Sequence, residues 1–283
     1  MSAAITIDTT PLGTALGAEL EGLDLSTPPD ETTTATLRAA LRQHHVVRVR
    51  DQHLDEAALK RLGECFGDLI IHPNLVAAGD HPEVITIRKE PGDSGIIGAE
   101  WHTDTTCLEK PPMGAILHAI DVPPMGGDTL FANQHLAYEA LSETMQSLLC
   151  TLRAVHNDTR VAGPQAGLNA RRTVKTREKA WEKTETVHPV VTTHPETGRR
   201  ALYVNIAYTR HFEGMTEDES QPLLEFLLHH AVRPEFSYRF QWQRGDVLFW
   251  DNRCLKHIAM NDYPGHRREM IRVQIAGHRP YLA

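Results

Sequence analysis

The sequence predicts a mainly β fold with flanking helices, of the double-stranded β-helix or jelly-roll type. Many short β-branched segments are separated by turn residues, few segments have helical periodicity, and no internal repeat or low-complexity linker interrupts them. A chain of 283 residues with 41% hydrophobic content can bury a sizeable core, and β-rich barrels of this size commonly form one domain. We therefore expect residues 1–283 to form a single domain.

The N-terminal part is predicted to alternate helices and strands. A helix is expected over residues 30–45, with Asp30 as its N-cap, because a short carboxylate accepts hydrogen bonds from the first turn. The β-branched segment 46–50 follows as a strand. A second helix is expected over residues 55–66, closed by Gly67 in the position that favours a left-handed backbone.

The rest of the chain supplies most of the expected strands. They are predicted at 113–121, 129–131, 188–193, 201–204, 236–241, 246–250 and 270–276. The Thr197-Gly198 pair marks a hairpin. One helix is expected to pack outside the barrel over residues 136–149, and Thr216 with Glu219 forms a capping box for a helix with a leucine-rich face.

Residues 157–181 differ from the rest of the chain, because they are polar, rich in Arg and Lys, and lack a clear period. A loop this long in a compact domain is often a lid or a binding loop. We expect it to close over a pocket, where Arg171, Arg172 and Lys175 could recruit an anion. A disordered or oligomer-contacting insertion is the alternative.

Composition and charge exclude several classes of function. The net charge is −8, whereas a nucleic-acid-binding surface normally gives a basic excess. No stretch approaches the roughly 18 apolar residues needed to span a bilayer, and the chain does not begin with a basic segment followed by an apolar run. We therefore expect a cytoplasmic protein without a nucleic-acid or membrane partner.

The four cysteines, Cys65, Cys107, Cys150 and Cys254, are widely scattered and form no Cys-X-X-Cys pair. Disulfides and zinc knuckles are therefore not expected. Cys107 and Cys254 lie near the candidate metal ligands described next. We expect them to be reduced, buried packing residues, with contact to an active-site pocket as the alternative.

His102, Asp104 and the distant His257 form the most informative pattern in the chain. If segment 102–104 is an extended strand, His102 and Asp104 project from the same face, because side chains alternate along a strand. Two neutral imidazoles and one carboxylate on one side of a metal leave the opposite positions open, which is typical of a non-haem Fe(II) oxygenase.

A chance His-X-Asp has to be considered, because the chain has 17 histidines. Many of these lie in helix-like segments where we expect them to be solvated, such as His44, His45, His229 and His230. The flanking motifs argue against chance. They are Trp101-His102-Thr103-Asp104, Gly126-Gly127-Asp128-Thr129, Trp250-Asp251-Asn252-Arg253, and Arg267-Arg268 with Arg272. These motifs resemble the taurine dioxygenase family of Fe(II)/2-oxoglutarate enzymes, over nearly the whole chain.

The resemblance implies a cupin-like jelly roll in which the three candidate ligands bind Fe(II), with 2-oxoglutarate as co-substrate and O2 as oxidant. It also implies that Thr129 helps to hold one 2-oxoglutarate carboxylate. Arg268, eleven residues after His257, matches the arginine that grips the same group. A guanidinium suits this role, since it offers a bidentate fork and stays charged. Arg267 is the competitor, and the interval favours Arg268.

Arg272 matches the position at which the family binds substrate, four residues after Arg268 and on the same predicted strand face. It is expected to be a positive charge without a compensating partner, which indicates an anionic substrate; an exterior salt bridge is the alternative. By the same resemblance His72 is expected to contact the anion, chiefly when both its ring nitrogens are protonated. Tyr208 is expected to lie against the substrate, and Gly98 replaces a polar contact.

Several further segments resemble the aryloxyalkanoate, or (R)-phenoxypropionate, dioxygenase branch more than taurine dioxygenase itself. They are 185–189, 193–195, 202–205 and 213–220. We therefore expect hydroxylation of a C–H bond in an aryloxyalkanoate-type acid that is cleaved afterwards, with release of succinate and CO2. A sulfonate or an alkyl sulfate ester is the alternative substrate. The family resemblance also implies a homo-oligomer.

Two other classes of function use the same residues differently. A zinc hydrolase could hold a metal-bound water with the same three ligands, but Thr129 and Arg268 would then have no role. A non-catalytic jelly-roll binding protein would not require the complete set of metal-ligand and co-substrate residues.

Overall fold

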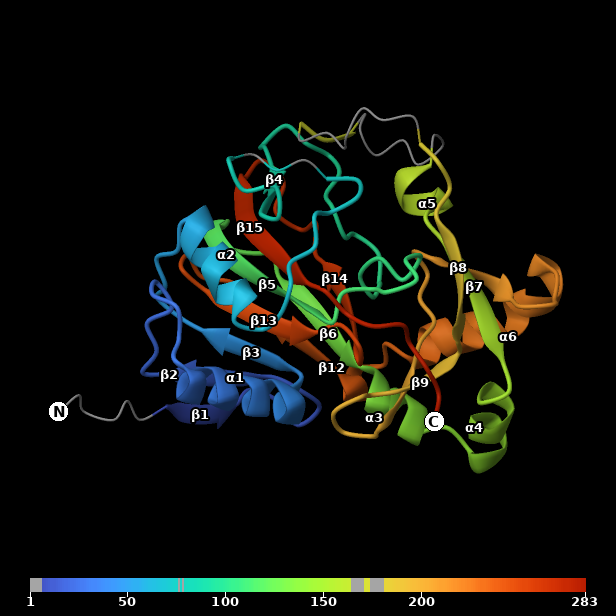
Figure 1. The fold of residues 1–283 in the computed structure, drawn as a ribbon. Coiled ribbons are helices and arrows are strands. Elements are labelled where there is room, and N and C mark those ends of the chain that lie inside the picture. The colour runs from blue at the N-terminus through green and yellow to red at the C-terminus, as the bar shows by residue number, and fades with distance from the viewer. Residues whose placement is uncertain (1–6, 76, 78, 164–170, 174–180) are drawn as a thin grey trace.

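A computed structural model describes residues 7–75, 77, 79–163, 171–173 and 181–283 (Figure 1). The strands are β1 (Asp8–Pro11), β2 (Ala18–Glu21), β3 (Val46–Val49), β4 (Ile85–Lys89), β5 (Gly114–Asp121), β6 (Thr129–Asn133), β7 (Arg153–Asn157), β8 (Glu185–Pro189), β9 (Val191–Thr193), β10 (Arg200–Leu202), β11 (Thr209–Phe212), β12 (Ser237–Phe240), β13 (Val247–Asp251), β14 (Leu255–Ala259) and β15 (Arg268–Ile275). The helices are α1 (Glu31–His44), α2 (Glu56–Glu64), α3 (Gln134–Glu139), α4 (Glu143–Leu149), α5 (Thr159–Ala162), α6 (Glu217–His230) and the 3₁₀ turn η3 (Pro234–Phe236).

Two sheets form the jelly roll that the sequence predicts. The larger has the strand order β1-β2-β3-β13-β5-β15-β4, and the smaller has the order β12-β6-β14. Strands distant in sequence are neighbours in both sheets, as with β3 and β13 or β6 and β14. Figure 1 shows the smaller sheet lying alongside the larger one, so that the two enclose the interior of the barrel. The predicted fold class is confirmed.

The helices α1 and α2 cover the outer face of the larger sheet (Figure 1). They bury leucines such as Leu41 and Leu59 against strand residues including Val47 and Ile116. Both helices begin as predicted, since the Asp30 carboxylate accepts a hydrogen bond from the N–H of Thr33 at 2.7 Å, and Asp55 caps α2 in the same way. This outer layer shields the outer face of the sheet from solvent.

The core between the two sheets is aromatic. The ring of Phe131 on β6 lies 5.4 Å from that of Phe240 on β12 and 5.7 Å from that of Trp250 on β13. Leu117 and Met270 belong to the same buried cluster. These side chains fill one part of the barrel, so the polar residues discussed below are gathered in the part that is left.

A third layer contains α3, α4 and α6 with the sheet β11-β7-β8 and the hairpin β9-β10. The prediction of a single helix over residues 136–149 is wrong, because two helices, α3 and α4, occupy this region. Helix α3 ends at Glu139, and Ser142 caps α4 by accepting a hydrogen bond from the N–H of Met145 at 3.3 Å. The Ser142 hydroxyl thus offers the backbone a hydrogen bond that replaces the one a continuous helix would make. The hairpin at Gly198 and the capping box of Thr216 and Glu219 are confirmed.

The expectation of solvated histidines is wrong for two of the four residues. His45 at the end of α1 and His230 at the end of α6 are both buried. His230 donates from Nε2 to the Ala137 carbonyl at 2.7 Å. The helix ends point into the protein rather than to solvent, which periodicity alone does not reveal. Among the described residues, no helix is long and apolar enough to span a membrane.

Gly114 offers a test of how tightly the central strand β5 is held. A Cβ at this position would lie 2.5 Å from the Trp250 carbonyl oxygen. The strand cannot shift, because Gly114 pairs with Asp251 on one side and Ile275 on the other. We predict that Gly114→Ala lowers the free energy of unfolding, measured in urea, by about 3 kcal/mol.

The matched control is Gly92→Ala, because nothing lies within 4 Å of a Cβ at that position. It should change the free energy of unfolding by less than about 0.5 kcal/mol. Equal effects of the two substitutions would contradict the packing described for β5.

Candidate active site

His102, Asp104 and His257 converge on one point of the barrel. The backbones of His102 and His257 form an isolated antiparallel bridge, with N–H to carbonyl hydrogen bonds of 2.9 and 2.7 Å. The Oδ1 atom of Asp104 lies 3.6 Å from Nε2 of His102 and 3.8 Å from Nε2 of His257. The three candidate ligand atoms all lie within 4.8 Å of one another, close enough to share one metal ion.

The extended strand predicted for residues 102–104 is wrong, although both side chains do face the same side. Only His102 makes a strand-like bridge, and a turn begins at Asp104. Thr105 then adopts a positive φ of 42°. The turn carries the backbone away from His257, so a single bridge, rather than a continuous strand, holds this segment.

Asn252 fixes the position of Asp104. Its side-chain carbonyl accepts a hydrogen bond from the N–H of Asp104 at 2.8 Å, and its amide donates to the Asp104 carbonyl at 3.2 Å and to the Pro112 carbonyl at 3.0 Å. The Thr103 hydroxyl donates to the Leu255 carbonyl at 2.8 Å. The sequence motif contained Asn252 but gave no sign of this role, because its partners are backbone atoms far away in sequence.

Hydrogen bonding and burial give the three side chains the charge states that suit a divalent metal. Nδ1 of His102 donates to the Glu100 carbonyl at 2.6 Å, which leaves the lone pair on Nε2. Burial, with the neighbouring His102 and Arg272, lowers the pKa of His257 to about 3, so this ring is neutral. Burial would raise the pKa of Asp104, but Arg272 and the two histidines hold it well below its usual range. The neutral ring of His257 and Nε2 of His102 therefore face one carboxylate.

The three residues line a cavity of about 520 Å³. Its apolar wall comes from several strands and includes Ile87, Ile96, Leu117, Phe131, Trp250 and Ala259. Among the described residues its cationic groups are Arg160, Arg171, Arg172, Arg268 and Arg272, and its carboxylates are Glu100 and Asp104. The cavity therefore combines a metal-binding geometry with apolar surface and a marked excess of positive charge, which suits a small organic anion.

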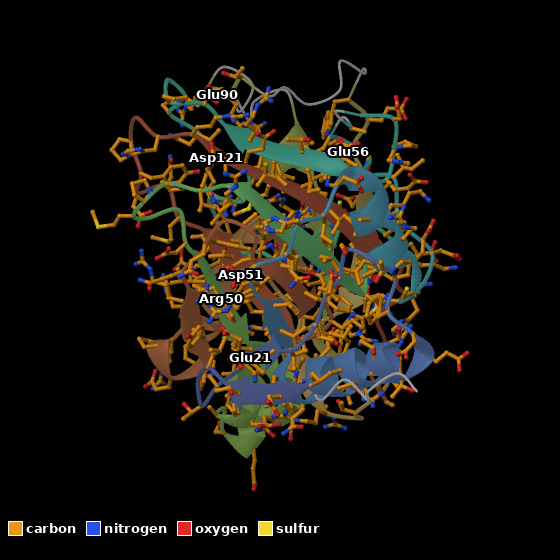
Figure 2. All side chains as sticks on the ribbon, turned by 90° about the vertical axis from the view of Figure 1, so that its left-hand side faces the viewer. Glu21, Arg50, Asp51, Glu56, Glu90 and Asp121 are labelled. Carbon is orange, nitrogen blue, oxygen red and sulfur yellow. The ribbon has the colours of Figure 1, made fainter. Side chains whose placement is uncertain are left out.

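Arg268 lies in this cavity and Arg267 does not. Arg268 is buried, and among the described residues its Nε has no hydrogen-bond partner and its guanidinium has no ion-pair partner. Arg267 is exposed and pairs with Glu90 at 3.7 Å and Asp121 at 3.6 Å. Figure 2 shows these two carboxylates near each other on the outside of the barrel. The geometry thus separates the two neighbouring arginines as the sequence interval predicts.

Thr129 and Arg268 both contact Trp242. The Thr129 hydroxyl accepts a hydrogen bond from Nε1 of Trp242 at 3.0 Å, and the Arg268 guanidinium lies 5.7 Å from the centre of the Trp242 ring. Both residues line the cavity. Burial lowers the pKa of Arg268, but an arginine still carries its charge at neutral pH. A buried cation without a protein counter-charge is a binding site for an anion.

The expectation that Arg272 is an uncompensated charge is wrong. Its Nη1 lies 3.4 Å from both carboxylate oxygens of Asp104. Arg272 and Asp104 meet because both point into the barrel, from β15 and from the turn after His102. Nε of Arg272 is buried without a hydrogen-bond partner in the described structure. The side chain thus has bonding capacity left beyond Asp104, and it is not an exterior salt bridge.

His72, Tyr208 and Gly98 all line the cavity, as expected. Nδ1 of His72 accepts hydrogen bonds from the N–H groups of Asn74 and Leu75, each at 3.1 Å. With Nδ1 as the acceptor of these two bonds, the ring carries its proton on Nε2, and the stronger contribution expected when both nitrogens are protonated stays a prediction. Gly98 has a φ of 81°, and a Cβ there would lie 3.2 Å from Cε1 of His102.

Some of the described residues of segment 157–181 line the cavity. Arg160 on α5 and the pair Arg171 and Arg172 contribute to its wall, and the N–H of Gly95 donates to the Arg171 carbonyl at 3.0 Å. Arg160 was not singled out by the sequence, although it belongs to the basic segment that was. Lys175 lies outside the described residues.

Cys107 and Cys254 are buried free thiols and are not among the residues that line the cavity. Burial raises the pKa of Cys107 to about 12. The expectation of reduced, buried cysteines agrees with both positions.

Comparison with known proteins agrees with the site. Residues 8–274 match the family described as taurine catabolism dioxygenase TauD, TfdA family. An alkylsulfatase of Acinetobacter baylyi is 35% identical over 93% of this chain and 82% of its own length. An alpha-ketoglutarate-dependent sulfate ester dioxygenase of Pseudomonas putida is 34% identical over 98% of this chain and 92% of its own.

One further relative belongs to the predicted aryloxyalkanoate branch, and one solved structure is a taurine dioxygenase. The (S)-phenoxypropionate/alpha-ketoglutarate-dioxygenase of Delftia acidovorans is 32% identical over 90% of this chain and 89% of its own length. The crystal structure of a taurine dioxygenase from Burkholderia xenovorans covers 97% of this chain and 90% of its own, with a TM-score of 0.81 and 35% identity. The sulfate-ester relatives thus have the higher identity, which does not favour the aryloxyalkanoate branch.

Asn252 allows the metal-binding geometry to be tested apart from the ligands. Asn252→Ala removes the three hydrogen bonds that position Asp104 and the segment that follows it. We predict that it weakens Mn(II) binding, measured by calorimetry under anaerobic conditions, on the order of 10- to 100-fold. Asn261→Ala is the control, because Asn261 is exposed and, within the described residues, its side chain donates to the Ser94 carbonyl alone. Unchanged Mn(II) affinity in Asn252→Ala would show that Asp104 does not depend on this contact.

Proposed function

Since the chain belongs to the taurine catabolism dioxygenase TauD, TfdA family, and is an Fe(II)- and 2-oxoglutarate-dependent dioxygenase, we propose that it hydroxylates a small sulfate ester or sulfonate. The observation that carries this proposal is the cavity, where five arginines and an apolar wall surround a candidate iron site. Family membership sets aside the zinc hydrolase and the non-catalytic binding protein. A homo-oligomer stays a prediction.

His102, Asp104 and His257 are the residues that would hold iron. Their donor set of two neutral imidazole nitrogens and one carboxylate suits Fe(II), and all three lie on one side of the cavity. When bound, iron and 2-oxoglutarate supply the oxidising power that inserts one atom of O2 into a substrate C–H bond. The protein's own task is to orient these groups and the target carbon.

Arg268 and Thr129 would hold the distal carboxylate of 2-oxoglutarate. This role is supported by the buried guanidinium of Arg268, which has no ion-pair partner among the described residues. A carboxylate can accept two parallel hydrogen bonds from such a fork. The Thr129 hydroxyl already accepts a hydrogen bond from Trp242, so its own proton is left to donate.

Arg272 would bind the anionic group of the substrate, with Nε2–H of His72 as a second donor. Arg272 also forms an ion pair with Asp104, and its positive charge keeps this carboxylate ionised and in place. Tyr208, Ile87 and Leu117 offer apolar surface for an alkyl or aryl group. We propose that the arginines of segment 157–181 draw the anion in, since they add positive charge at the same cavity.

A sulfate ester would be cleaved as a consequence of its hydroxylation. Oxygen inserted at the carbon that bears the ester oxygen gives an unstable product, which collapses to an aldehyde and hydrogensulfate; succinate and CO2 are released from 2-oxoglutarate. An aryloxyalkanoate would fragment in the same way, to a phenol and a 2-oxoacid. It is the second candidate, because the chain is 32% identical to the Delftia enzyme.

The role of Arg268 can be separated from that of its neighbour. We predict that Arg268→Ala raises the KM for 2-oxoglutarate about 30-fold or more, since losing a buried, charge-assisted contact costs on the order of 2 kcal/mol or more. The KM for the organic substrate should change much less. Both constants are obtained from succinate formation.

Arg267→Ala is the matched control, because Arg267 is adjacent but exposed. Its KM for 2-oxoglutarate should stay within about fivefold of the wild-type value. A larger effect in Arg267→Ala than in Arg268→Ala would mean that the wrong arginine has been assigned.

A substrate panel tests the proposed chemistry. We predict that a medium-chain alkyl sulfate supports succinate formation with one sulfate released per succinate, and that the uncharged ether of the same chain length does not. An alkanesulfonate and an aryloxyalkanoate belong in the same panel. Faster turnover of the aryloxyalkanoate would favour the second candidate. Equal turnover of the sulfate and the ether would show that the anion is not recognised.

A further inference from the structure

A second cluster of metal-ligating side chains lies outside the cavity. It consists of His45 at the end of α1, His135 in α3, and Cys254 in the turn between β13 and β14. All three residues are buried, none lines the cavity, and their candidate ligand atoms lie within 4.8 Å of one another. Neither the dioxygenase chemistry nor the substrate pocket uses them.

The spacing within this cluster suits a tetrahedral zinc ion. With Zn–N and Zn–S distances of about 2.0 and 2.3 Å, neighbouring N and S ligands lie roughly 3.5 Å apart. Nδ1 of His45 lies 3.6 Å from Sγ of Cys254. The ring centres of His45 and His135 are 5.3 Å apart. A thiolate and two imidazoles therefore need only small side-chain movements to share an ion.

His135 has the hydrogen bonding of a metal ligand. Its Nδ1 donates to the Arg200 carbonyl at 2.8 Å, which fixes the tautomer and leaves a lone pair on Nε2. This Nε2 is fully buried and has no hydrogen-bond partner among the described residues. A buried acceptor without a partner is costly unless something binds it. The unpartnered Nε2 of His135 is thus independent evidence that a cation binds at this cluster.

The backbone holds the three segments together. The N–H of Gln134 donates to the Cys254 carbonyl at 2.9 Å, and the N–H of Asp251 donates to the His45 carbonyl at 2.9 Å. His45 itself has a φ of 65°, a left-handed conformation that is unfavourable for a residue other than glycine. The cluster is therefore rigidly assembled, with one of its members held in a strained position.

The electrostatic surroundings also suit a cation. Burial lowers the pKa of His45 to about 3 and that of His135 to about 4, so both rings are neutral. A carboxylate oxygen of Asp251 lies within 4.8 Å of the Cys254 sulfur. Asp251 is already bonded to His194 at 2.9 Å and to Arg253, so it would act as a neighbouring anion rather than a ligand. Because Arg253 balances the charge of Asp251, a Cys254 thiolate would supply the negative charge of the site. Burial raises the pKa of the free Cys254 thiol, so the thiolate would form only as the ion binds.

We propose that His45, His135 and Cys254 bind a zinc ion in a buried site, separate from the iron site, with a water molecule as the fourth ligand of the tetrahedron. Zinc binding would replace the thiol proton of Cys254, which is released to solvent. The ion would join the end of α1 and the start of α3 to the β13–β14 turn. That turn lies three residues before His257, so the zinc site would stiffen the segment that carries one iron ligand.

Cobalt(II) distinguishes this site from the iron site. The iron site offers nitrogen and oxygen ligands only, whereas Cys254 would give a thiolate-to-cobalt charge-transfer band in the near ultraviolet. We expect the metal-free, full-length protein to bind two equivalents of Co(II), and this band to saturate with one of them. Added Zn(II) should abolish the band. A wild-type protein that shows no such band with excess Co(II) would overturn the proposal, whatever the variants do.

Two substitutions and a control locate the ion. Cys254→Ser should remove the band and one equivalent of bound metal. His135→Asn keeps a donor for the Arg200 carbonyl while removing Nε2, and it should weaken Co(II) binding at this site at least 10-fold. Cys107→Ser is the control, because Cys107 is also buried but lies in another cluster. A band that persists in Cys254→Ser or disappears in Cys107→Ser would show that the ion is bound elsewhere.

Discussion

Two backbone hydrogen bonds between His102 and His257 hold the candidate active site together. They join the segment around His102 to strand β14 near the C-terminal end of the chain. Each of these two segments contributes a candidate iron ligand. Asn252 reinforces this bridge, because its side chain bonds to the backbone on both sides of Asp104. The jelly roll makes the contact possible, since β14 reaches this position only by pairing with β6 in the smaller sheet.

The excess of buried positive charge is the second constraint on the site. Burying a charge without a partner is unfavourable, yet Arg268 is buried without a direct ion pair in the described structure. Arg272 is satisfied only in part, by the same carboxylate that faces the metal position. Such a site gains stability when anions bind. This is consistent with a reaction that brings two anions, a dicarboxylate and an anionic substrate, into one cavity.

The outer parts of the fold were predictable where local chemistry decides them. Asp30 and Thr216 cap their helices because their side chains reach the N–H groups of the first turn whatever the rest of the protein does. The helix predicted over residues 136–149 failed because Ser142 offered a competing cap in the middle of a helical pattern. The buried state of His45 and His230 was also missed, because the direction in which a helix end points depends on the layer beneath it.

The sequence by itself determined the identity of the candidate iron ligands, the choice of Arg268 over Arg267, and the family, because these depend on residue types at given intervals. Only the tertiary structure decided what each side chain meets. It paired Arg272 with Asp104, fixed the proton of His72 on Nε2, and brought His45 and His135 to Cys254. The contacts of Arg272 with Asp104 and of His45 and His135 with Cys254 join distant segments, whereas His72 is held by the backbone two and three residues further on. In both cases the folded conformation of the chain sets the hydrogen bonding that fixes charge and protonation. Residue spacing along the chain does not contain that information.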